Sequence, residues 1–412
     1  MIIQRDKYLN QLVASRGNGL IKIITGIRRC GKSFLLFELF KQQLLREGID
    51  TDHIIEMQFD DFANRKYRNA EVFYSYVKAK IRDGRMHFIL LDEVQMLDNF
   101  VDVLNGLLHL SNVDVYVTGS NARFLSKDVV TEFRGRGFQI HIAPLSFAEF
   151  FSVYNGSKEA AFEEYMKYGG LPPVVLQPTA EYKMQVLKGL LSETYIIDIL
   201  QRNSVRNTAE LEELLALVAS NIGGLTNHKK LSDTFKSVKD VSISSATIKT
   251  YIDYFIDAFI ISLAERYDIK GKKYIGAPVK YYFNDLGLRN ALLDFRQIES
   301  SHQMENVIYN EMRMRGYTVD VGVVVVNGKD DAGKSIRTRY KVDFVCNKGD
   351  KRLYIQSAFA LPTPEKVIQE TNSLTRISDE FQKIVVTGGH TIPTYNNDGI
   401  LFTNIYDFLL QQ

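Results

Sequence analysis

Strand-like and helix-like segments alternate along the first 150 residues. Five short runs, most of them almost entirely apolar, occur at 20–25, 53–59, 87–91, 113–118 and 138–142. Such runs are typical of strands buried on both faces of a parallel sheet. Segments with helical spacing lie between or after them, at 34–40, 70–82 and 99–110. The alternation predicts an α/β fold built on a parallel sheet.

The middle of the chain changes to a mainly helical pattern. Helical spacing occurs at 209–222, 228–236 and 242–259, and strand-like runs follow at 260–267 and 273–283. In the third helix Ile248, Ile252 and Phe255 fall on one face. Three helices followed by a hairpin predict a winged helix-turn-helix.

The last hundred residues return to a mixed pattern. A helix is expected at 303–315, and strands at 321–326, 336–344 and 353–359. We therefore predict three domains: an α/β domain with a helical lid at 1–195, a winged helix at 196–300, and a further α/β domain at 301–412.

Composition adds few constraints. A length of 412 residues fits two to four domains, and a net charge of +2 favours no particular partner. The two cysteines, Cys30 and Cys346, have no metal-ligand spacing and suit a reduced compartment. The first residues carry charge too early for a signal peptide, and the most apolar region, 251–264, contains two aspartates. We expect a cytoplasmic protein without a membrane span.

A glycine-rich stretch follows the first strand and precedes a helix. It fits the pattern Gly-x4-Gly-Lys-Ser, and with the next residue it comprises Gly26, Ile27, Arg28, Arg29, Cys30, Gly31, Lys32, Ser33 and Phe34. In this strand–loop–helix context, backbone N–H groups close around phosphates, Lys32 reaches the β- and γ-phosphates, and the Ser33 hydroxyl ligates Mg²⁺. The alternative is an ordinary glycine-rich turn.

Residues 328–335 match the same pattern but lack its context. The positions after it alternate between apolar and charged side chains, which indicates a strand rather than a helix. We interpret this second match as a hairpin loop.

Two acidic residues end the apolar run at 87–91. Asp92 is expected to hold Mg²⁺ through water, and Glu93 to polarise the attacking water. The alternative is a buried strand that ends in two solvated acids. After the next strand, Ser120 or Asn121 is expected either to sense the γ-phosphate or to cap a helix.

Two arginines lie in the stretch 132–137. Arginine near a triphosphate stabilises charge in the transition state, from the same subunit or from a neighbour in a homo-oligomer. Arg136 is the first candidate and Arg134 the second; a solvated surface arginine is the alternative.

Taken together, the motifs GIRRCGKS, LLDE, VTGSN, RGRG, PLSFAEF and GGLPPVV resemble a group of prokaryotic AAA+-related ATPases with a C-terminal domain of unknown function. The resemblance covers the whole chain. It implies ATP and Mg²⁺ as cofactors and a sheet whose sensor strand lies between the P-loop strand and the strand of Asp92. It also implies a winged helix and a nuclease-like domain.

Residues 301–412 are similar in element order to PD-(D/E)xK nucleases. Asp343 matches the first acid of that motif, and Glu305 the glutamate of the preceding helix. Gln356 and Ala358 stand where the second acid and the lysine belong. Without these two groups the metal and the nucleophilic water are poorly held, so we expect an inactive, restriction-endonuclease-like fold.

Together these residues predict an ATPase that relays a conformational change to its C-terminal domains. The partner is either double-stranded DNA, bound through Lys249, Lys270, Lys272 and Lys273, or another protein. A slow nucleotide-dependent signalling switch is the alternative, and an ATP-controlled nuclease is a third reading.

Overall fold

The structure, a computed structural model, describes residues 2–119, 133, 135–203, 205, 207–239, 242–329 and 335–411. The chain divides into two compact units. The first comprises residues 1–144 with 257–259, and the second 145–256 with 260–412. No helix among the described residues is long and apolar enough to cross a membrane.

The first unit is built on a five-stranded sheet in which every pair of neighbours is parallel, in the order β2-β3-β4-β1-β5. Its strands are β1 (Ile21–Thr25), β2 (Ile54–Gln58), β3 (His87–Asp92), β4 (Val113–Thr118) and β5 (Gly137–His141). These are the five predicted strands. The predicted sheet order is confirmed as well, because β4 lies between the P-loop strand β1 and the strand β3 that ends in Asp92.

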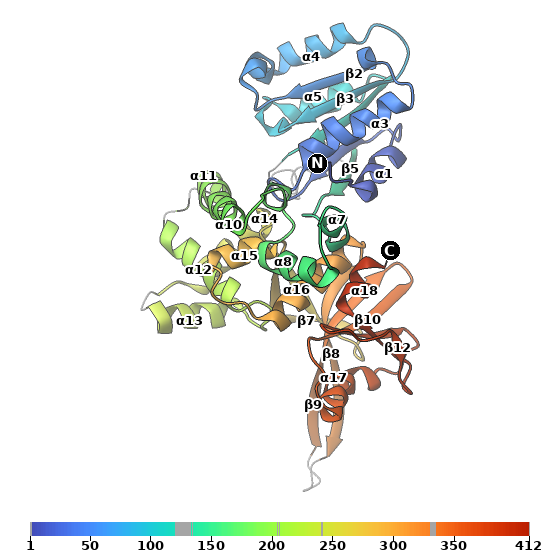
Figure 1. The fold of residues 1–412 in the computed structure, drawn as a ribbon. Helices are drawn as coiled ribbons and strands as arrows, with labels where there is room; N and C mark the ends of the chain where they lie inside the picture. Colours follow the sequence, from blue (N-terminus) through green and yellow to red (C-terminus); the bar gives the residue numbers. More distant parts are fainter. Residues whose placement is uncertain are drawn as a thin grey trace. The chain divides into compact units, whose positions relative to one another are not determined.

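Helical segments connect these strands (Figure 1). They are α1 (Asp6–Ala14), α2 (Lys32–Phe34), η1 (Leu35–Phe40), α3 (Lys41–Arg46), η2 (Thr51–His53), η3 (Phe62–Arg68), α4 (Ala70–Lys80), η4 (Val94–Met96) and α5 (Phe100–Leu107). The segments α2, η1 and α3 follow one another without a break, so a single helix runs from Lys32 to Arg46.

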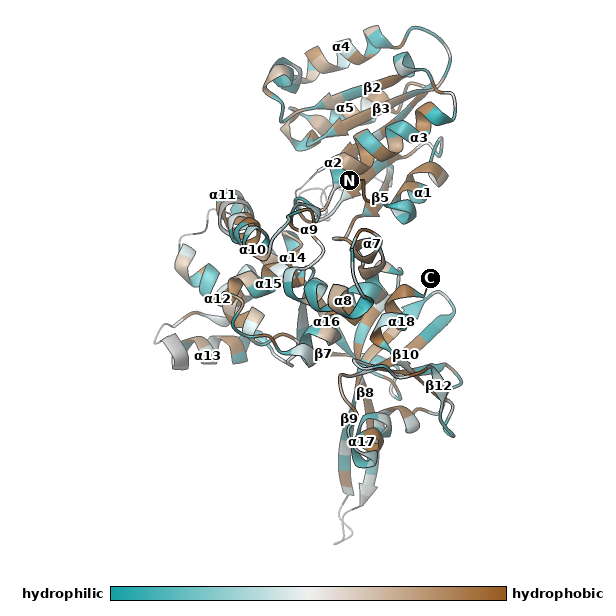
Figure 2. Ribbon diagram, in the orientation of Figure 1, coloured by the Kyte–Doolittle hydropathy of each residue, from teal (hydrophilic) through white to brown (hydrophobic). Residues whose placement is uncertain are grey.

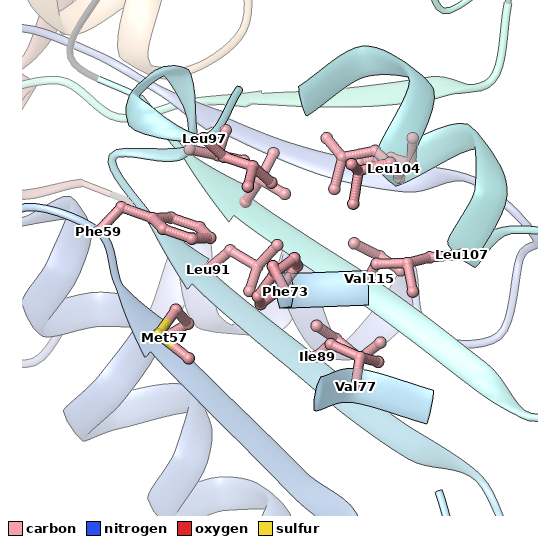
Figure 3. Close-up of a cluster of buried hydrophobic side chains, with 14 of the residues drawn as sticks. Met57, Phe59, Phe73, Val77, Ile89, Leu91, Leu97, Leu104, Leu107 and Val115 are labelled. Carbon is pink, nitrogen blue, oxygen red and sulfur yellow. The ribbon is translucent and has the colours of Figure 1, made fainter. Parts of the chain in front are cut away.

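An apolar core lies between the sheet and helices α4 and α5. Phe73 and Val77 from α4 and Leu104 and Leu107 from α5 pack against strand residues such as Ile89 (Figure 3). Burying one such side chain contributes roughly 1.5–3 kcal/mol. The strands are mostly hydrophobic, whereas hydrophobic and hydrophilic residues alternate along α4 (Figure 2). This contrast is why continuous apolar runs predict the strands and spaced ones the helices.

The second unit begins with a helical region, and further helices lie between and after its strands. Its helices are α7 (Phe147–Phe151), α8 (Lys158–Tyr168), α9 (Pro172–Val175), α10 (Ala180–Gly189), η6 (Leu190–Ile196), α11 (Ile197–Asn203), α12 (Thr208–Ser220), α13 (His228–Lys239), α14 (Ser245–Asp257), α15 (Leu286–Leu292), α16 (Ser300–Met314), α17 (Pro364–Thr375) and α18 (Ile405–Leu410). In α14 the predicted apolar face is buried, with Ile248, Ile252 and Phe255 inside.

An eight-stranded sheet, in the order β12-β13-β11-β10-β9-β8-β6-β7, completes this unit. Its strands are β6 (Ile261–Asp268), β7 (Lys273–Phe283), β8 (Thr318–Lys329), β9 (Ser335–Lys348), β10 (Lys351–Ala358), β11 (Gln382–Thr387), β12 (Thr394–Tyr395) and β13 (Ile400–Asn404). The hairpin expected to form the wing, β6–β7, is part of this sheet because β6 pairs in parallel with β8. The sheet thus continues across residue 300, where the sequence predicts a domain boundary; the division into three domains stays a prediction.

The second P-loop-like match is a hairpin, as predicted. Gly328 and Lys329 end β8, Ser335 begins β9, and the two strands pair in antiparallel fashion. The residues between them lie outside the described part of the chain.

The Gly-Gly-Leu-Pro segment contacts the start of α15 within the second unit. Asp285 is buried and caps α15 by accepting a hydrogen bond from Leu288 N–H at 3.1 Å, and it also accepts one from Gly170 N–H at 2.8 Å. Gly169 has φ +74°, and a Cβ there would lie 2.2 Å from the Asp285 carboxylate. Only glycine meets both conditions.

Candidate nucleotide site

The glycine-rich loop connects the carboxyl end of β1 to the helix that begins at Lys32. Gly26 has φ +149°, and a Cβ on it would lie 2.1 Å from the Ile142 carbonyl oxygen, so glycine is required there. Gly31, at φ +98°, directly precedes the helix. The loop therefore leads directly into the helix N-terminus, whose free backbone N–H groups favour an anion.

Lys32 is buried inside this loop. Its Nζ donates hydrogen bonds to the carbonyl oxygens of Gly26 at 3.0 Å and Ile27 at 3.2 Å. The ammonium group is thus held where it would face a bound phosphate. Ser33 and Phe34 are exposed, whereas Ile27 and Cys30 are buried. Arg28 is half-buried and Arg29 is exposed with φ +64°.

Arg5 supports the loop from behind, and sequence reasoning missed it. This buried side chain donates hydrogen bonds to the carbonyl oxygens of Cys30 at 3.1 Å and Ala143 at 2.8 Å. A lone arginine before the first helix carries no sequence signal for this role.

The carboxyl end of β3 brings two acidic residues to the same edge of the sheet. Asp92 is buried, its carboxylate accepts a hydrogen bond from the Thr118 hydroxyl group, and the Ser33 hydroxyl group lies beside it. Burial raises the pKa of Asp92, while these two hydroxyl groups lower it. Hydroxyl and carboxylate oxygens are ligands that Mg²⁺ prefers. Ser33 and Asp92 thus fit a magnesium ion beside the phosphates.

Glu93 follows in a left-handed conformation, with φ 49° and ψ 46°. Its backbone N–H donates to the Thr118 hydroxyl at 3.3 Å, and its carboxylate accepts a hydrogen bond from Gln95. Thr118, the last residue of β4, therefore contacts both acidic residues. Sequence reasoning placed the sensing role at Ser120 or Asn121 and missed Thr118, although a polar residue at a strand end is the available signal.

The remaining predicted residues of this site divide into two groups. Ser120, Asn121 and Arg134 lie outside the described residues. Arg136 is described and exposed; it directly precedes β5, and its carbonyl oxygen accepts a hydrogen bond from Ile21 N–H at the start of β1. Arg136 thus lies at the amino edge of the sheet, opposite the P-loop.

Comparison with known proteins agrees with this geometry. Residues 18–151 match the family described as AAA domain, and residues 159–299 match a domain of unknown function, DUF8612. An uncharacterized protein of Haemophilus influenzae is 34% identical over 416 residues, covering 100% of this chain and 99% of that protein. The chain belongs to the family of this Haemophilus protein.

A second relative, the uncharacterized protein MJ1544 of Methanocaldococcus jannaschii, is 27% identical over 84% of this chain and 76% of its own length. Among solved structures, Orc1 of Aeropyrum pernix in complex with DNA is similar with a TM-score of 0.31 and 12% identity, covering 71% of this chain and 93% of that chain. Cdc6p of Pyrobaculum aerophilum is similar with a TM-score of 0.30 and 13% identity, covering 71% of this chain and 94% of that chain. These TM-scores are too low to support any inference. The AAA family and the sheet order make the first unit an AAA-type P-loop domain.

In this family member, the predicted nuclease-like residues also come together. Glu305 lies on α16, Asp343 on β9 and Gln356 on β10, in the predicted order of elements. The Gln356 amide oxygen accepts a hydrogen bond from Asp343 N–H at 3.3 Å, and Asp343 Oδ2 accepts one from Ser357 N–H at 3.0 Å. Ala358 is buried in an apolar cluster.

Lys280 of β7 completes this cluster, and sequence reasoning did not find it. Its Nζ forms an ion pair with Glu305 and lies 3.8 Å from Asp343 Oδ1, while Lys341 Nζ lies 2.8 Å from the same oxygen. Burial alone would raise the pKa of Asp343, but the two ammonium groups outweigh it and lower that pKa. The Lys280 ammonium lies beside both carboxylates and neutralises negative charge that would otherwise attract a divalent cation.

Proposed function

We propose that this protein binds ATP with Mg²⁺ at the P-loop and hydrolyses it. The observation that carries the proposal is the position of Asp92: it accepts a hydrogen bond from Thr118 and lies beside Ser33, at the N-terminus of the helix that follows the loop. Lys32 would bind the β- and γ-phosphates, and Ser33 and Asp92 would hold the magnesium ion, which neutralises charge on the phosphates.

Glu93 is the proposed base. Its carboxylate would orient a water molecule, whose oxygen bonds to the γ-phosphorus while the bond to the β–γ bridging oxygen breaks. The proton of the water passes to Glu93 and then to solvent, and ADP and phosphate leave. Adenine is favoured over guanine by the AAA-domain match. The chain has an Asn-Lys-x-Asp sequence at 347–350, but it forms the turn between β9 and β10 in the second unit and is not a loop of the P-loop domain.

Hydrolysis would drive a conformational change that is relayed to a winged helix and a nuclease-like domain in the second unit. The Lys280 ion pairs support a nuclease-like domain that does not cleave. Lys270, Lys272 and Lys273 are exposed around the β6–β7 turn and would suit DNA phosphates. Lys249, however, is paired with Asp253 at 2.7 Å, which favours a protein partner at α14.

Steady-state ATP hydrolysis by the wild type, Lys32→Ala and Glu93→Gln, each with and without duplex DNA, tests the proposal. We expect magnesium-dependent turnover that both substitutions abolish. A rise in turnover with DNA that weakens steeply with salt supports DNA as the partner; turnover indifferent to DNA supports a protein partner. If the wild type binds ATP tightly without hydrolysing it, and Lys32→Ala removes this binding, the protein is a nucleotide-dependent switch and not an ATPase. Turnover that survives Lys32→Ala overturns the site.

A further inference from the structure

Two histidines and an aspartate meet at the amino edge of the first sheet, away from the P-loop. His53 ends η2, His87 is the first residue of β3, and Asp83 lies in the connection between α4 and β3. Both imidazoles are buried, and their ring centroids are 4.6 Å apart. One ring nitrogen of each histidine and one Asp83 oxygen all lie within 4.8 Å of one another. The nucleotide site uses none of these residues.

The ring of His87 is held as metal-binding histidines are held elsewhere. The Arg85 carbonyl oxygen lies 2.9 Å from His87 Nδ1 and can only accept a hydrogen bond. In the neutral ring the proton is therefore on Nδ1, and the lone pair is on Nε2. His53 Nδ1 lies 3.9 Å from an Asp50 oxygen, beyond hydrogen-bond distance. A carbonyl or carboxylate behind the non-ligating nitrogen is the usual partner of a metal-binding histidine.

Asp83 is fixed as an anion in the same place. Its two oxygens accept hydrogen bonds from Arg85 N–H and from Arg85 Nε, each at 2.9 Å. His53 Nε2 lies 3.1 Å from both oxygens. A cation that binds both groups replaces the proton that they share.

These residues line a cavity of about 430 Å³, so water or a further ligand has access to the cluster. Lys80, Arg82 and Arg85 line it together with Asp50, Asp52 and Asp83. Three basic side chains balance the three acids, which gives a weakly coordinating cation such as Mg²⁺ no net attraction. Imidazole ligands instead select ions such as Zn²⁺.

We propose that His53, Asp83 and His87 form a binding site for one divalent transition-metal ion of the Zn²⁺ class. The ion would take two imidazole nitrogens and one carboxylate oxygen, and water would complete its coordination. It would tie the α4–β3 connection to η2 and β3. The proposal is independent of ATP hydrolysis, because the site lies at the opposite edge of the sheet.

Calorimetric titration of the tag-free, chelator-treated full chain with Zn²⁺ tests the proposal. We expect one ion per chain, no comparable binding of Mg²⁺, and a visible spectrum of low-symmetry Co²⁺ when cobalt replaces zinc. Asp83→Asn and His87→Gln should weaken Zn²⁺ binding by more than the roughly 10–100-fold that outer partners contribute. Asp83 is exposed, so its variant keeps the fold even if loss of the buried His87 does not.

His390→Gln is the matched control, because His390 is exposed and lies in the second unit. It should bind Zn²⁺ like the wild type, and so should Lys32→Ala. Zinc binding that Asp83→Asn and His87→Gln leave unchanged would mean an adventitious ion only and would overturn the proposal. Absence of stoichiometric binding by the wild type would overturn it as well.

Discussion

At the scale of single residues, Thr118 links the two acids of the candidate nucleotide site. Its hydroxyl donates to Asp92 and accepts from the Glu93 N–H, and the side chain is fully buried. Asp92 would hold the magnesium ion and Glu93 would orient the water. One hydroxyl group therefore holds the Asp92 carboxylate and the backbone of Glu93.

Thr118→Val tests this link. Valine has the shape of threonine but cannot donate to Asp92, and a hydrogen bond to a charged group contributes roughly 1.5–3 kcal/mol. If the bond orients Asp92 and Glu93 for reaction, ATP turnover should fall roughly ten- to a hundredfold. The measurement is steady-state hydrolysis at saturating ATP, together with the KM for ATP.

Thr118→Ser, which keeps the hydroxyl, is the control and should retain most of the activity. A thermal unfolding curve of each variant checks that the fold is intact. Wild-type turnover in Thr118→Val would show that Thr118 only fills space.

The sequence predicts Lys32, Ser33, Asp92 and Glu93 because each has a fixed place in a local motif. Thr118 and Lys280 belong to no such motif. Lys280 reaches Glu305 and Asp343 only because β7 and α16 pack together in the folded chain. Residues whose role depends on packing between distant segments are the ones that local patterns do not reveal.

At the scale of elements, Asp285 couples the Gly-Gly-Leu-Pro segment to helix α15. Burial raises the pKa of Asp285 to about 6 from an unfolded value of 3.8, although backbone N–H groups, that of Gly170 first, oppose the rise. Between these two values the folded protein binds the proton more tightly than the unfolded chain. The contribution of Asp285 to the free energy of unfolding should therefore increase as the pH falls from about 7 to 4.

Two pKa units correspond to about 3 kcal/mol, which bounds this contribution. Asp285→Asn removes the titrating group. The free energy of unfolding of the wild type, minus that of the variant, should therefore rise as the pH is lowered from 7 to 5. Urea unfolding of the second unit, followed by circular dichroism, measures it. Asp398→Asn, at an exposed aspartate, is the control. If the free energy of unfolding of the wild type, relative to the variant, stays constant or falls in acid, the raised pKa is contradicted.

Apolar sequence patterns predict the strands of this protein but not how distant strands pair. Each strand of the first unit is predicted within a residue or two. The central strands β1, β3 and β4 are buried on both faces and leave a continuous apolar signal, whereas the edge strand β5 is mostly exposed. The hairpin β6–β7 is predicted too, but its pairing with β8 is not. Alternation fixes which face of a strand is buried and says nothing about which distant strand lies beside it.

At the scale of the whole molecule, the position of Arg136 favours action on a nucleotide bound by a neighbouring subunit. Arg136 precedes β5 at the amino edge of the sheet, and the P-loop follows β1 at the carboxyl edge. The five residues of β1 separate these edges by roughly 16 Å. An exposed arginine at that distance would reach a triphosphate more readily in a neighbouring copy than in its own, across a head-to-tail interface.

Mixing two inactive variants tests action between subunits. Arg136→Ala keeps the P-loop but loses the arginine, and its turnover should fall by roughly 10³-fold if the arginine stabilises the transition state. Lys32→Ala keeps the arginine but binds no phosphate. In an equimolar mixture, about a quarter of head-to-tail interfaces would pair an intact P-loop with an intact arginine. The mixture should therefore hydrolyse ATP much faster than either variant alone.

Arg65→Ala, at another exposed arginine of the first unit, is the matched control and should keep wild-type turnover. Mixing Lys32→Ala with Glu93→Gln distinguishes the mechanism further. Both of those substitutions damage the same site, so every interface in that mixture has a defective P-loop or a defective base, and no activity should return. Recovery only in the Arg136→Ala mixture would mean that each active site is completed by the next subunit. Turnover equal to the sum of the separate variants would mean that Arg136 acts in its own subunit, and wild-type turnover by Arg136→Ala alone would leave Arg136 a surface residue.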